Sequence, residues 1–370
     1  MKRGLLATTA LAAGLTFTAS GIANTASAQS AKPSLTLSGS SEQEFGYAEN
    51  DGRLGRVGFD QHSDGEVHFN FKTTLDNGLK ISGRIELEGN TSSDQIDEHF
   101  MRITGSFGQI TLGSDDNVAN GFSIEPPQEG IGIADIDKWV HEQNVDGFLN
   151  QDYDNASEDS EKVSYVTPSF AGFKAGISYI PAWDQDSNSS PASQTAQYSS
   201  GWAFGLNYEG KMGGVSIEAG VNHLTFTDGP SAAMAIGDPR STNAGVKLGF
   251  GGFSIGVTGG WVDDMRQGTG SDSELEDGTM YEIGVGYGQG PWGVALTYHH
   301  GEVDGLTSDP DKDESDLILL AASYKLGPGV TVHGNVFHAD WQGEASDSDT
   351  ATTADGNDGT GAVVGIKVSF

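Results

Sequence analysis

The chain has 370 residues, no cysteine, 54 glycines and a formal net charge of −33. Without cysteine it can form neither a disulfide scaffold nor a zinc–thiolate site. The excess of carboxylates makes nucleic acid an unfavourable partner, because the phosphate backbone is itself anionic.

The first 28 residues have the pattern of a secretory signal peptide. Lys2 and Arg3 precede an alanine-rich apolar stretch, which is followed by the small-residue sequence Ala26-Ser27-Ala28. A short basic start, an apolar run and an A-x-A site are the three parts of such a peptide. We therefore expect cleavage after Ala28, leaving residues 29–370 as the mature protein. An anchoring helix is the alternative, but threonines and small residues dilute the apolar run.

After this segment, no stretch approaches the ~18 consecutive apolar residues of a membrane-spanning helix. Apolar and polar residues instead alternate with a period of two, which is typical of strands. Sixteen such segments lie near 34–48, 65–76, 78–90, 97–107, 109–115, 161–169, 172–180, 199–210, 213–227, 241–250, 253–263, 278–288, 292–302, 314–326, 329–340 and 360–370. A membrane protein built of strands must close into a barrel, because only closure satisfies every backbone polar group.

The connections alternate between short turns and long loops. Asn77-Gly78 is a strong hairpin signal, and Gly251-Gly252 forms another short connection. The longest loop, about 116–160, lacks strand periodicity, and acidic residues collect in the long loops. These features predict an all-β fold: a 16-stranded antiparallel transmembrane β-barrel in one domain, with both ends of the mature chain on the short-turn side.

The two faces of the segments differ as a membrane barrel requires. In the third segment, leucine or isoleucine at 79, 81, 85 and 87 alternates with polar or charged residues at 80, 82, 84, 86 and 88. An Arg or Lys facing lipid at mid-bilayer would cost roughly 2–4 kcal/mol, so these charges must face the lumen. A soluble antiparallel sandwich shows the same alternation. The high strand number and the aromatic residues near strand ends, such as Trp202 and Tyr208, favour the membrane barrel.

Several segments resemble the general diffusion porins of Gram-negative bacteria, especially the alphaproteobacterial type. They are Arg56-Val-Gly-Phe59, the stretch Phe100–Ser114, the stretch Val163–Phe173 and the terminal aromatic Phe370. The resemblance implies a trimeric, water-filled channel in the outer membrane, with the third loop folded into the pore to form a constriction. It also implies that Phe370 is the signal read by the outer-membrane assembly machinery. Outer-membrane lipid, two further copies of the chain and small hydrophilic solutes are then the expected partners.

Opposite charges at the constriction are common in this family, and the sequence offers both signs. The basic wall candidates share the lumen-facing parity on adjacent strands, and they are Lys72, Lys80, Arg84 and Arg102. The acidic loop candidates Asp135 and Asp137 lie near the middle of the long loop. Each basic residue has an alternative role as a lumen charge paired with an acid on a neighbouring strand. Because acids greatly outnumber bases, we expect weak cation selectivity.

No cofactor and no dedicated metal site are predicted. Asp309, Asp311 and Asp313 have the first spacings of a calcium loop, but Glu314 stands where glycine is needed and Leu320 where a bidentate acid is needed. Loose binding of calcium by the acidic loops is the alternative that the sequence leaves open. No catalytic motif is present, which predicts a protein that is not an enzyme.

Three functional classes remain: a general diffusion porin, a substrate-selective or adhesive barrel, and a secreted acidic calcium-binding repeat protein. The third would show glycine–aspartate nonapeptides at a fixed period, and the sequence has none. A selective channel would need an aromatic track or a ring of one charge. The mixed candidate constriction therefore favours the general porin.

Overall fold

The computed structural model describes residues 32–50, 58–89, 95–141, 157, 160–182, 198–228, 238–267, 274–305, 311–343 and 356–370. The predicted signal peptide, 1–28, lies outside the described residues, as does most of the second half of the long loop. Among the residues described, no helix is long and apolar enough to cross a membrane.

Sixteen strands form in the described part of the chain, in agreement with the sixteen segments predicted from sequence periodicity. They are β1 (Ser34–Ala48), β2 (Phe59–Thr74), β3 (Lys80–Glu88), β4 (Ile96–Gly105), β5 (Gly108–Ser114), β6 (Glu161–Val166), β7 (Phe173–Ala182), β8 (Tyr198–Met212), β9 (Val215–Asp228), β10 (Arg240–Phe250), β11 (Phe253–Gln267), β12 (Glu274–Gln289), β13 (Trp292–Val303), β14 (Asp313–Gly327), β15 (Val330–Gln342) and β16 (Gly356–Ser369). Two short 3₁₀ helices, η2 (Asn120–Phe122) and η3 (Ala134–Lys138), lie between β5 and β6.

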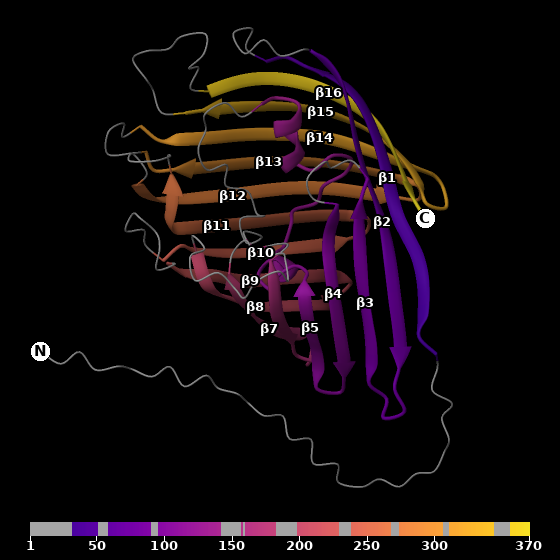
Figure 1. Cartoon of the computed structure of the whole chain (residues 1–370). Helices are drawn as coiled ribbons and strands as arrows, with labels where there is room; N and C mark the ends of the chain where they lie inside the picture. The colour runs from indigo at the N-terminus through magenta and orange to yellow at the C-terminus, as the bar shows by residue number, and fades with distance from the viewer. Residues whose placement is uncertain are drawn as a thin grey trace, which may run out of the picture.

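Each strand pairs antiparallel with its neighbours in sequence, and β1 pairs with β16 to close the barrel (Figure 1). The closing seam runs from Ser40 opposite Ser369 to Ala48 opposite Gly361. Beyond the last ladder pair, the Phe370 amide donates to the Gly39 carbonyl at 3.0 Å, and the Gly39 amide donates to the Phe370 carbonyl at 2.9 Å. The fold predicted from the sequence is thus confirmed, including the closure on which a membrane-spanning sheet depends.

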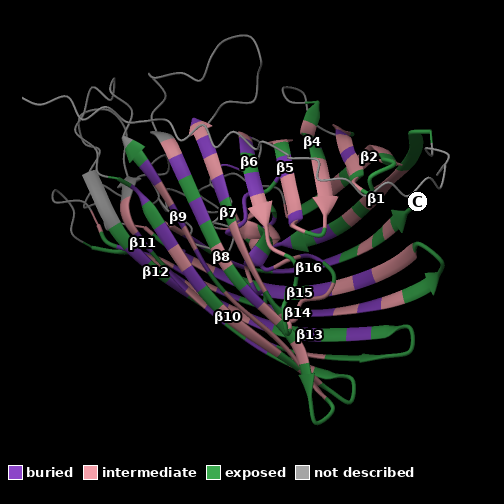
Figure 2. Ribbon diagram, turned by 90° about the horizontal axis from the view of Figure 1, so that it is seen from below, coloured by how far each residue is buried: buried purple, intermediate pink, exposed green. Residues whose placement is uncertain are grey.

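Burial alternates along the strands, as the banding in Figure 2 shows. On β14, for example, buried Leu317 and Leu319 alternate with exposed Ile318 and Leu320. Many of the exposed positions carry large apolar side chains, which suits an outer surface in contact with lipid. Aromatic pairs lie near strand ends, including Phe253–Tyr287 and Trp292–Tyr324, each with ring centroids 4.5 Å apart.

Short turns gather at one end of the barrel and long loops at the other. The β8–β9 and β10–β11 connections are the two-residue turns Gly213-Gly214 and Gly251-Gly252, in which all four glycines have positive φ. Such φ values are favourable for glycine and costly for other residues. Ser34 and Phe370 lie at the short-turn end, as predicted. Ser34 is opposite Lys72, close to the β2–β3 turn, and Phe370 follows Val368, which is opposite Val330 at the β14–β15 turn.

Candidate pore constriction

The long loop after β5 lies along the inner face of the barrel wall, in a track made by glycines. A Cβ atom on Gly245 would lie 2.8 Å from Ile124 Cβ, and one on Gly256 would lie 2.9 Å from Pro126 Cα. Separations below 3.0 Å leave no room for a side chain. On seven consecutive strands, β7–β13, lumen-facing glycines would place a Cβ within 3.0 Å of the loop, and they are Gly176, Gly205, Gly220, Gly245, Gly256, Gly284, Gly286 and Gly293. Gly46 on β1 meets the far end of the loop in the same way, 2.9 Å from Trp139.

Hydrogen bonds from the wall hold the same loop along its length. In chain order, the Val118 amide donates to Ser178 Oγ (2.9 Å), Thr297 Oγ1 donates to the Pro127 carbonyl (2.9 Å), Ser323 Oγ donates to Glu129 Oε2 (2.5 Å), the Ile131 amide donates to Asn335 Oδ1 (3.2 Å) and Trp341 Nε1 donates to the Val140 carbonyl (2.8 Å). These contacts come from β7, β13, β14 and β15. The described part of the loop is therefore fixed to the wall from β7 to β15, and its far end also reaches β2, where Trp139 stacks on His62 with ring centroids 4.4 Å apart.

The far end of the described loop is anchored by apolar packing. Ile133, Ile136 and Val140 are fully buried and belong to one cluster with lumen-facing side chains of β14–β16. Figure 1 shows η3 on the inner side of these strands. Burying a residue such as isoleucine contributes about 1.5–3 kcal/mol, so this end of the loop is firmly seated.

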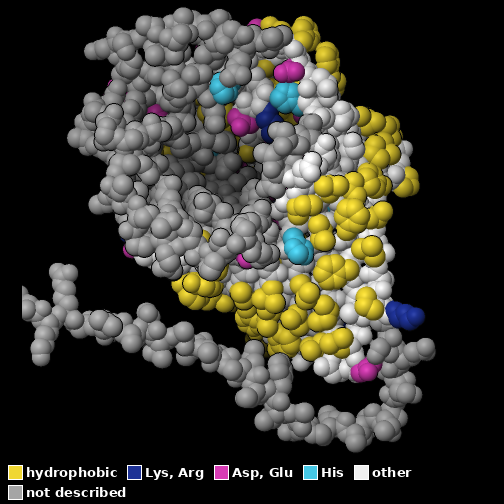
Figure 3. Space-filling view, in the orientation of Figure 1, with side chains coloured by type: hydrophobic (Ala, Val, Ile, Leu, Met, Phe, Trp, Pro, Cys, Tyr) yellow, Lys and Arg dark blue, Asp and Glu magenta, His cyan; other side chains and the backbone are white. Residues whose placement is uncertain are grey.

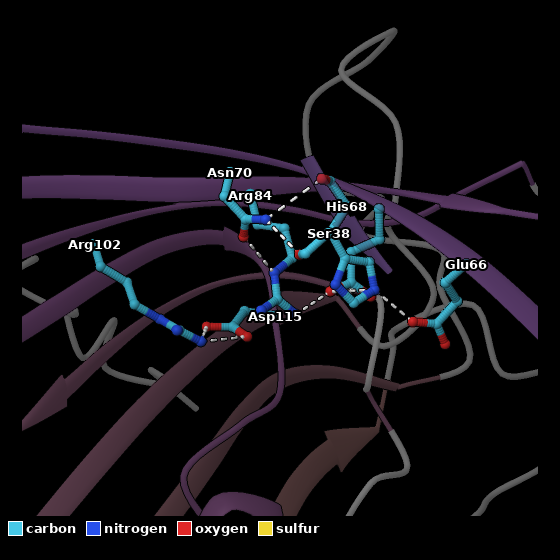
Figure 4. A network of polar contacts seen from close by, with 8 residues as sticks. Ser38, Glu66, His68, Asn70, Arg84, Arg102 and Asp115 are labelled. Carbon is cyan, nitrogen blue, oxygen red and sulfur yellow. Dashed lines mark hydrogen bonds and ion pairs between the residues drawn. The ribbon is translucent and has the colours of Figure 1, made fainter. Parts of the chain in front are cut away.

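Arg84 lies further round the wall, in a polar network on β1–β3 (Figure 4). Its Nε donates to Asn70 Oδ1 at 3.2 Å, and its NH1 group contacts Glu86 Oε1. Asn70 Nδ2 in turn donates to Ser38 Oγ at 2.8 Å. The Arg84 side chain is about one-third exposed, so it faces the lumen while its orientation is fixed by the neighbouring strands.

Arg102 joins the wall to the beginning of the loop. It forms a two-pronged ion pair with Asp115, with NH2–oxygen distances of 2.9 and 2.7 Å, and its guanidinium lies 4.1 Å from the Phe100 ring centroid. Lys162 Nζ also donates to the Asp115 carbonyl. Charge-assisted bonds of this kind are the stronger hydrogen bonds in proteins, so Arg102 has a structural role as well as a lumen-facing charge.

Lys72 and Lys80 lie nearer the short-turn end than Arg84. Lys80 is opposite Thr104 in the β3–β4 ladder. Lys72 and Arg102 are both opposite Ser82, in the next lumen-facing row, and Arg84 is one row further from the short-turn end. The four predicted basic residues thus occupy three successive lumen-facing rows, and Lys72 and Lys80 are exposed. Lys80 and Arg84 are four residues apart on one strand, or roughly 13 Å.

The two predicted loop acids lie in η3, near the middle of the long loop. Asp135 pairs with Lys138 at 2.6 Å, and one of its oxygens accepts from the Gly132 amide at 3.2 Å. Burial raises the pKa of the Asp137 carboxyl above its ordinary value, although the Lys138 backbone amide and side chain act in the opposite direction. Asp135 is therefore partly neutralised, while Asp137 holds its negative charge less firmly than a free aspartate.

Acidic residues on the wall itself were not singled out from the sequence as constriction residues. Glu42 and Glu44 on β1, and Glu66 and Glu86 on β2 and β3, all face the lumen. The signal that could have identified them is the same period-two parity that placed Arg84 inside the barrel. Together with Arg84 and Arg102 they form a wall of mixed charge.

A row of buried polar groups crosses β12, β13 and β14. His299 Nδ1 lies 3.2 Å from Glu282 Oε1, and His299 Nε2 lies 3.2 Å from Ser315 Oγ. The acid–histidine–serine arrangement resembles that of a serine hydrolase, but Glu282 and His299 are 0% exposed and Ser315 is 2% exposed. Because a solute cannot reach the hydroxyl, the row acts as a polar cross-link within the wall.

The lumen and the outer surface differ sharply in chemistry. Figure 3 shows a hollow in the molecule with acidic, basic and histidine side chains close together beside it, and apolar side chains spread over the outer surface. The terminal residue Phe370 belongs to that outer surface, at 62% exposure. A closed barrel with this polarity is an outer-membrane channel architecture.

Comparison with known proteins supports the same class and identifies the family. A model described as Gram-negative porin matches residues 7–343, and the chain belongs to this family. The major outer membrane protein P.IA of Neisseria meningitidis serogroup C is 24% identical over 269 residues, which cover 71% of this chain and 63% of that protein. The chain thus matches less than two-thirds of the Neisseria protein's length.

Two solved structures show the same fold. An anion-selective porin from Comamonas acidovorans aligns with a TM-score of 0.64 at 18% identity, covering 92% of this chain and 100% of that one. The in-vitro folded OmpT of Vibrio cholerae, in its trimer form, aligns with a TM-score of 0.62 at 14% identity, covering 91% and 99%. The chain is therefore a β-barrel protein of the Gram-negative outer membrane.

Proposed function

We propose that the protein is a water-filled channel for passive diffusion of small hydrophilic solutes and ions, with a mixed-charge constriction and a weak preference for cations. The observation that carries the proposal is the arrangement of the long loop along the inner wall from β7 to β15, beside the charged lumen face of β1–β4. A loop fixed to the wall in this way narrows the lumen, as a diffusion channel with a constriction requires.

The mixed charge suits dipolar, hydrated solutes. Arg84 and Arg102 contribute positive charge beside carboxylates such as Glu66 and Glu86. Apolar solutes would have to displace water held by these groups, so they would pass more slowly. Charged side chains in a pore also set ion preference. The acidic residues on the wall and the net charge of −33 favour cations, while the two arginines limit the preference.

We further propose that the protein assembles as a homotrimer, with its apolar outer face in contact with lipid. The trimer form recorded for the Vibrio structural relative supports this assembly. Phe370, at the end of the closing strand, is proposed as the recognition signal for the assembly machinery. Loose calcium binding to the acidic long loops is part of the same proposal.

Swelling of liposomes that contain the purified protein tests the diffusion function. For a general channel, the entry rate of uncharged sugars falls smoothly with solute size and does not saturate with concentration. A substrate-selective barrel, the second candidate, would instead give saturable entry of one solute that its analogues inhibit. An adhesive barrel would give no swelling above that of protein-free liposomes.

A further inference from the structure

Three side chains of the kind that bind metal ions meet on the lumen face of β2 and β3. His68 Nε2 lies 2.5 Å from Glu66 Oε2 and 3.6 Å from Glu86 Oε1. The side chains of Glu66, His68 and Glu86 are 27%, 16% and 6% exposed, so the group is sheltered but open to the lumen on one side. Figure 4 shows Glu66 and His68 beside Arg84.

The barrel wall itself brings these atoms together. His68 is directly opposite Glu86 in the β2–β3 ladder, and Glu66 is two residues before His68 on the same face of β2. One ligand atom from each residue lies within 4.8 Å of the others. Because the strands fix all three backbones, little order has to be gained when an ion binds.

We propose that Glu66, His68 and Glu86 bind one divalent transition-metal ion, with Zn²⁺ as the best fit. An imidazole nitrogen with two carboxylates is a zinc-type donor set, whereas Ca²⁺ and Mg²⁺ prefer oxygen alone. Ligands about 2.1 Å from a tetrahedral zinc ion are about 3.4 Å apart. The separation of 3.6 Å between His68 and Glu86 is close to this value, and the 2.5 Å separation between His68 and Glu66 would have to widen by about 0.9 Å. Three protein ligands leave the fourth position for water.

A second group with the same residue types, Glu42, Glu44 and His333, is less suited to a metal. Asn335 Oδ1 accepts from the Ile131 amide at 3.2 Å, so Asn335 Nδ2 is the atom that faces His333 Nδ1, at 2.8 Å. Nδ1 of neutral His333 therefore accepts a hydrogen bond, and the proton is on Nε2, which lies 2.8 Å from Glu42 Oε1. A protonated Nε2 cannot bind an ion. Metal-binding histidines instead donate from their other nitrogen.

His68 is free of this restriction. None of the described residues makes a hydrogen bond with its Nδ1, so Nδ1 can carry the proton and leave Nε2 to the metal. Arg84 contacts the same Glu86 oxygen, and its positive charge opposes the ion. Removing that charge by Arg84→Gln should therefore tighten zinc binding.

Binding is tested on the purified full-length protein in detergent, titrated with ZnCl₂ in a calorimeter. We expect one site whose affinity falls at least about tenfold in His68→Gln, since losing a residue that only orients a ligand already costs roughly 10–100-fold. His62→Gln is the matched control, because His62 lies on the lumen face of the same strand but outside the group of three, with its ring stacked on Trp139 at 4.4 Å. His333→Gln is the control for the second group. Both controls should bind zinc like the wild type.

Three results would overturn the site: no zinc binding by the wild type, equal binding by His68→Gln, or loss of binding in His333→Gln alone. A circular dichroism spectrum with unchanged strand content shows that each variant is folded. If His68→Gln does not fold, Glu66→Gln replaces it, with the same expected loss.

The effect of the ion on permeation rests on the proposed channel function. Two positive charges added beside Arg84 should move the reversal potential toward anion preference in the wild type but not in His68→Gln. If calorimetry detects the site and the protein conducts no ions, the channel function fails while the metal site stands. If the protein conducts ions, but calorimetry detects no zinc binding and ZnCl₂ does not change the reversal potential, the metal site fails and the channel function stands.

Discussion

Replacing Gly245 with alanine should unseat the constriction loop. The new Cβ would lie 2.8 Å from Ile124 Cβ and 2.9 Å from the Ile124 carbonyl oxygen, where ordinary contact begins near 3.4 Å. The loop must then move from the wall by about 0.6 Å at this point. Because Gly245 lies on the inner face of β10, the only direction open to the loop is toward the lumen.

The cost of this displacement can be estimated from overpacked protein cores, in which an added methyl group costs about 1–3 kcal/mol. An energy of that size shifts an equilibrium between seated and unseated loop by about 5–150-fold. We therefore expect a lower open-channel conductance, together with at least about a fivefold longer time in partly closed states.

Single-channel recording in planar bilayers measures both quantities. Gly334→Ala is the matched control, because it places the same methyl group in a strand with no heavy atom within 4 Å of the new Cβ. It should conduct like the wild type. Identical conductance and closing kinetics in Gly245→Ala and Gly334→Ala would show that the loop does not lie against this glycine track.

Three further predictions concern the charges and anchors of the constriction. Neutralising Arg84 and Arg102 together with glutamine should raise cation preference, and unchanged reversal potentials under a salt gradient would remove both from the selective region. As pH falls from 7, Asp137 should lose its charge before an ordinary aspartate does, because burial raises its pKa. Cation preference should therefore begin to fall above the usual carboxyl range, and reversal potentials that follow the same pH curve in Asp137→Asn would contradict this. Trp341→Phe leaves the buried Val140 carbonyl without its 2.8 Å donor, which should cost about 1–3 kcal/mol of unfolding free energy in urea; no change would mean that this anchor is dispensable.

Periodicity predicted all sixteen strands, and it failed mainly where the outward positions are polar. β2 begins at Phe59 rather than near residue 65, because Gln61 and Ser63 occupy outward positions that elsewhere hold apolar residues. β16 likewise begins at Gly356 rather than near 360, since residues 356–360 include no apolar side chain. In both places, the ladder to the neighbouring strand sustains a strand that hydrophobic alternation does not reveal.

The site was less predictable than the wall. Parity placed Arg84 and Arg102 in the lumen, but it could not show that Asp115 neutralises Arg102 or that Lys138 pairs with Asp135. The glycine track was also hidden, because its members lie far apart in sequence and align only when the register of seven strands is known. Loop contacts of this kind depend on tertiary structure and have no local sequence signal.

The measurement that tests the central claim most directly is the conductance and reversal potential of the purified protein in a planar bilayer under a salt gradient. A diffusion porin should insert in large steps grouped in threes, with linear current and a modest cation preference. Silence, or small steps that one solute blocks, would contradict the account and favour a selective or adhesive barrel.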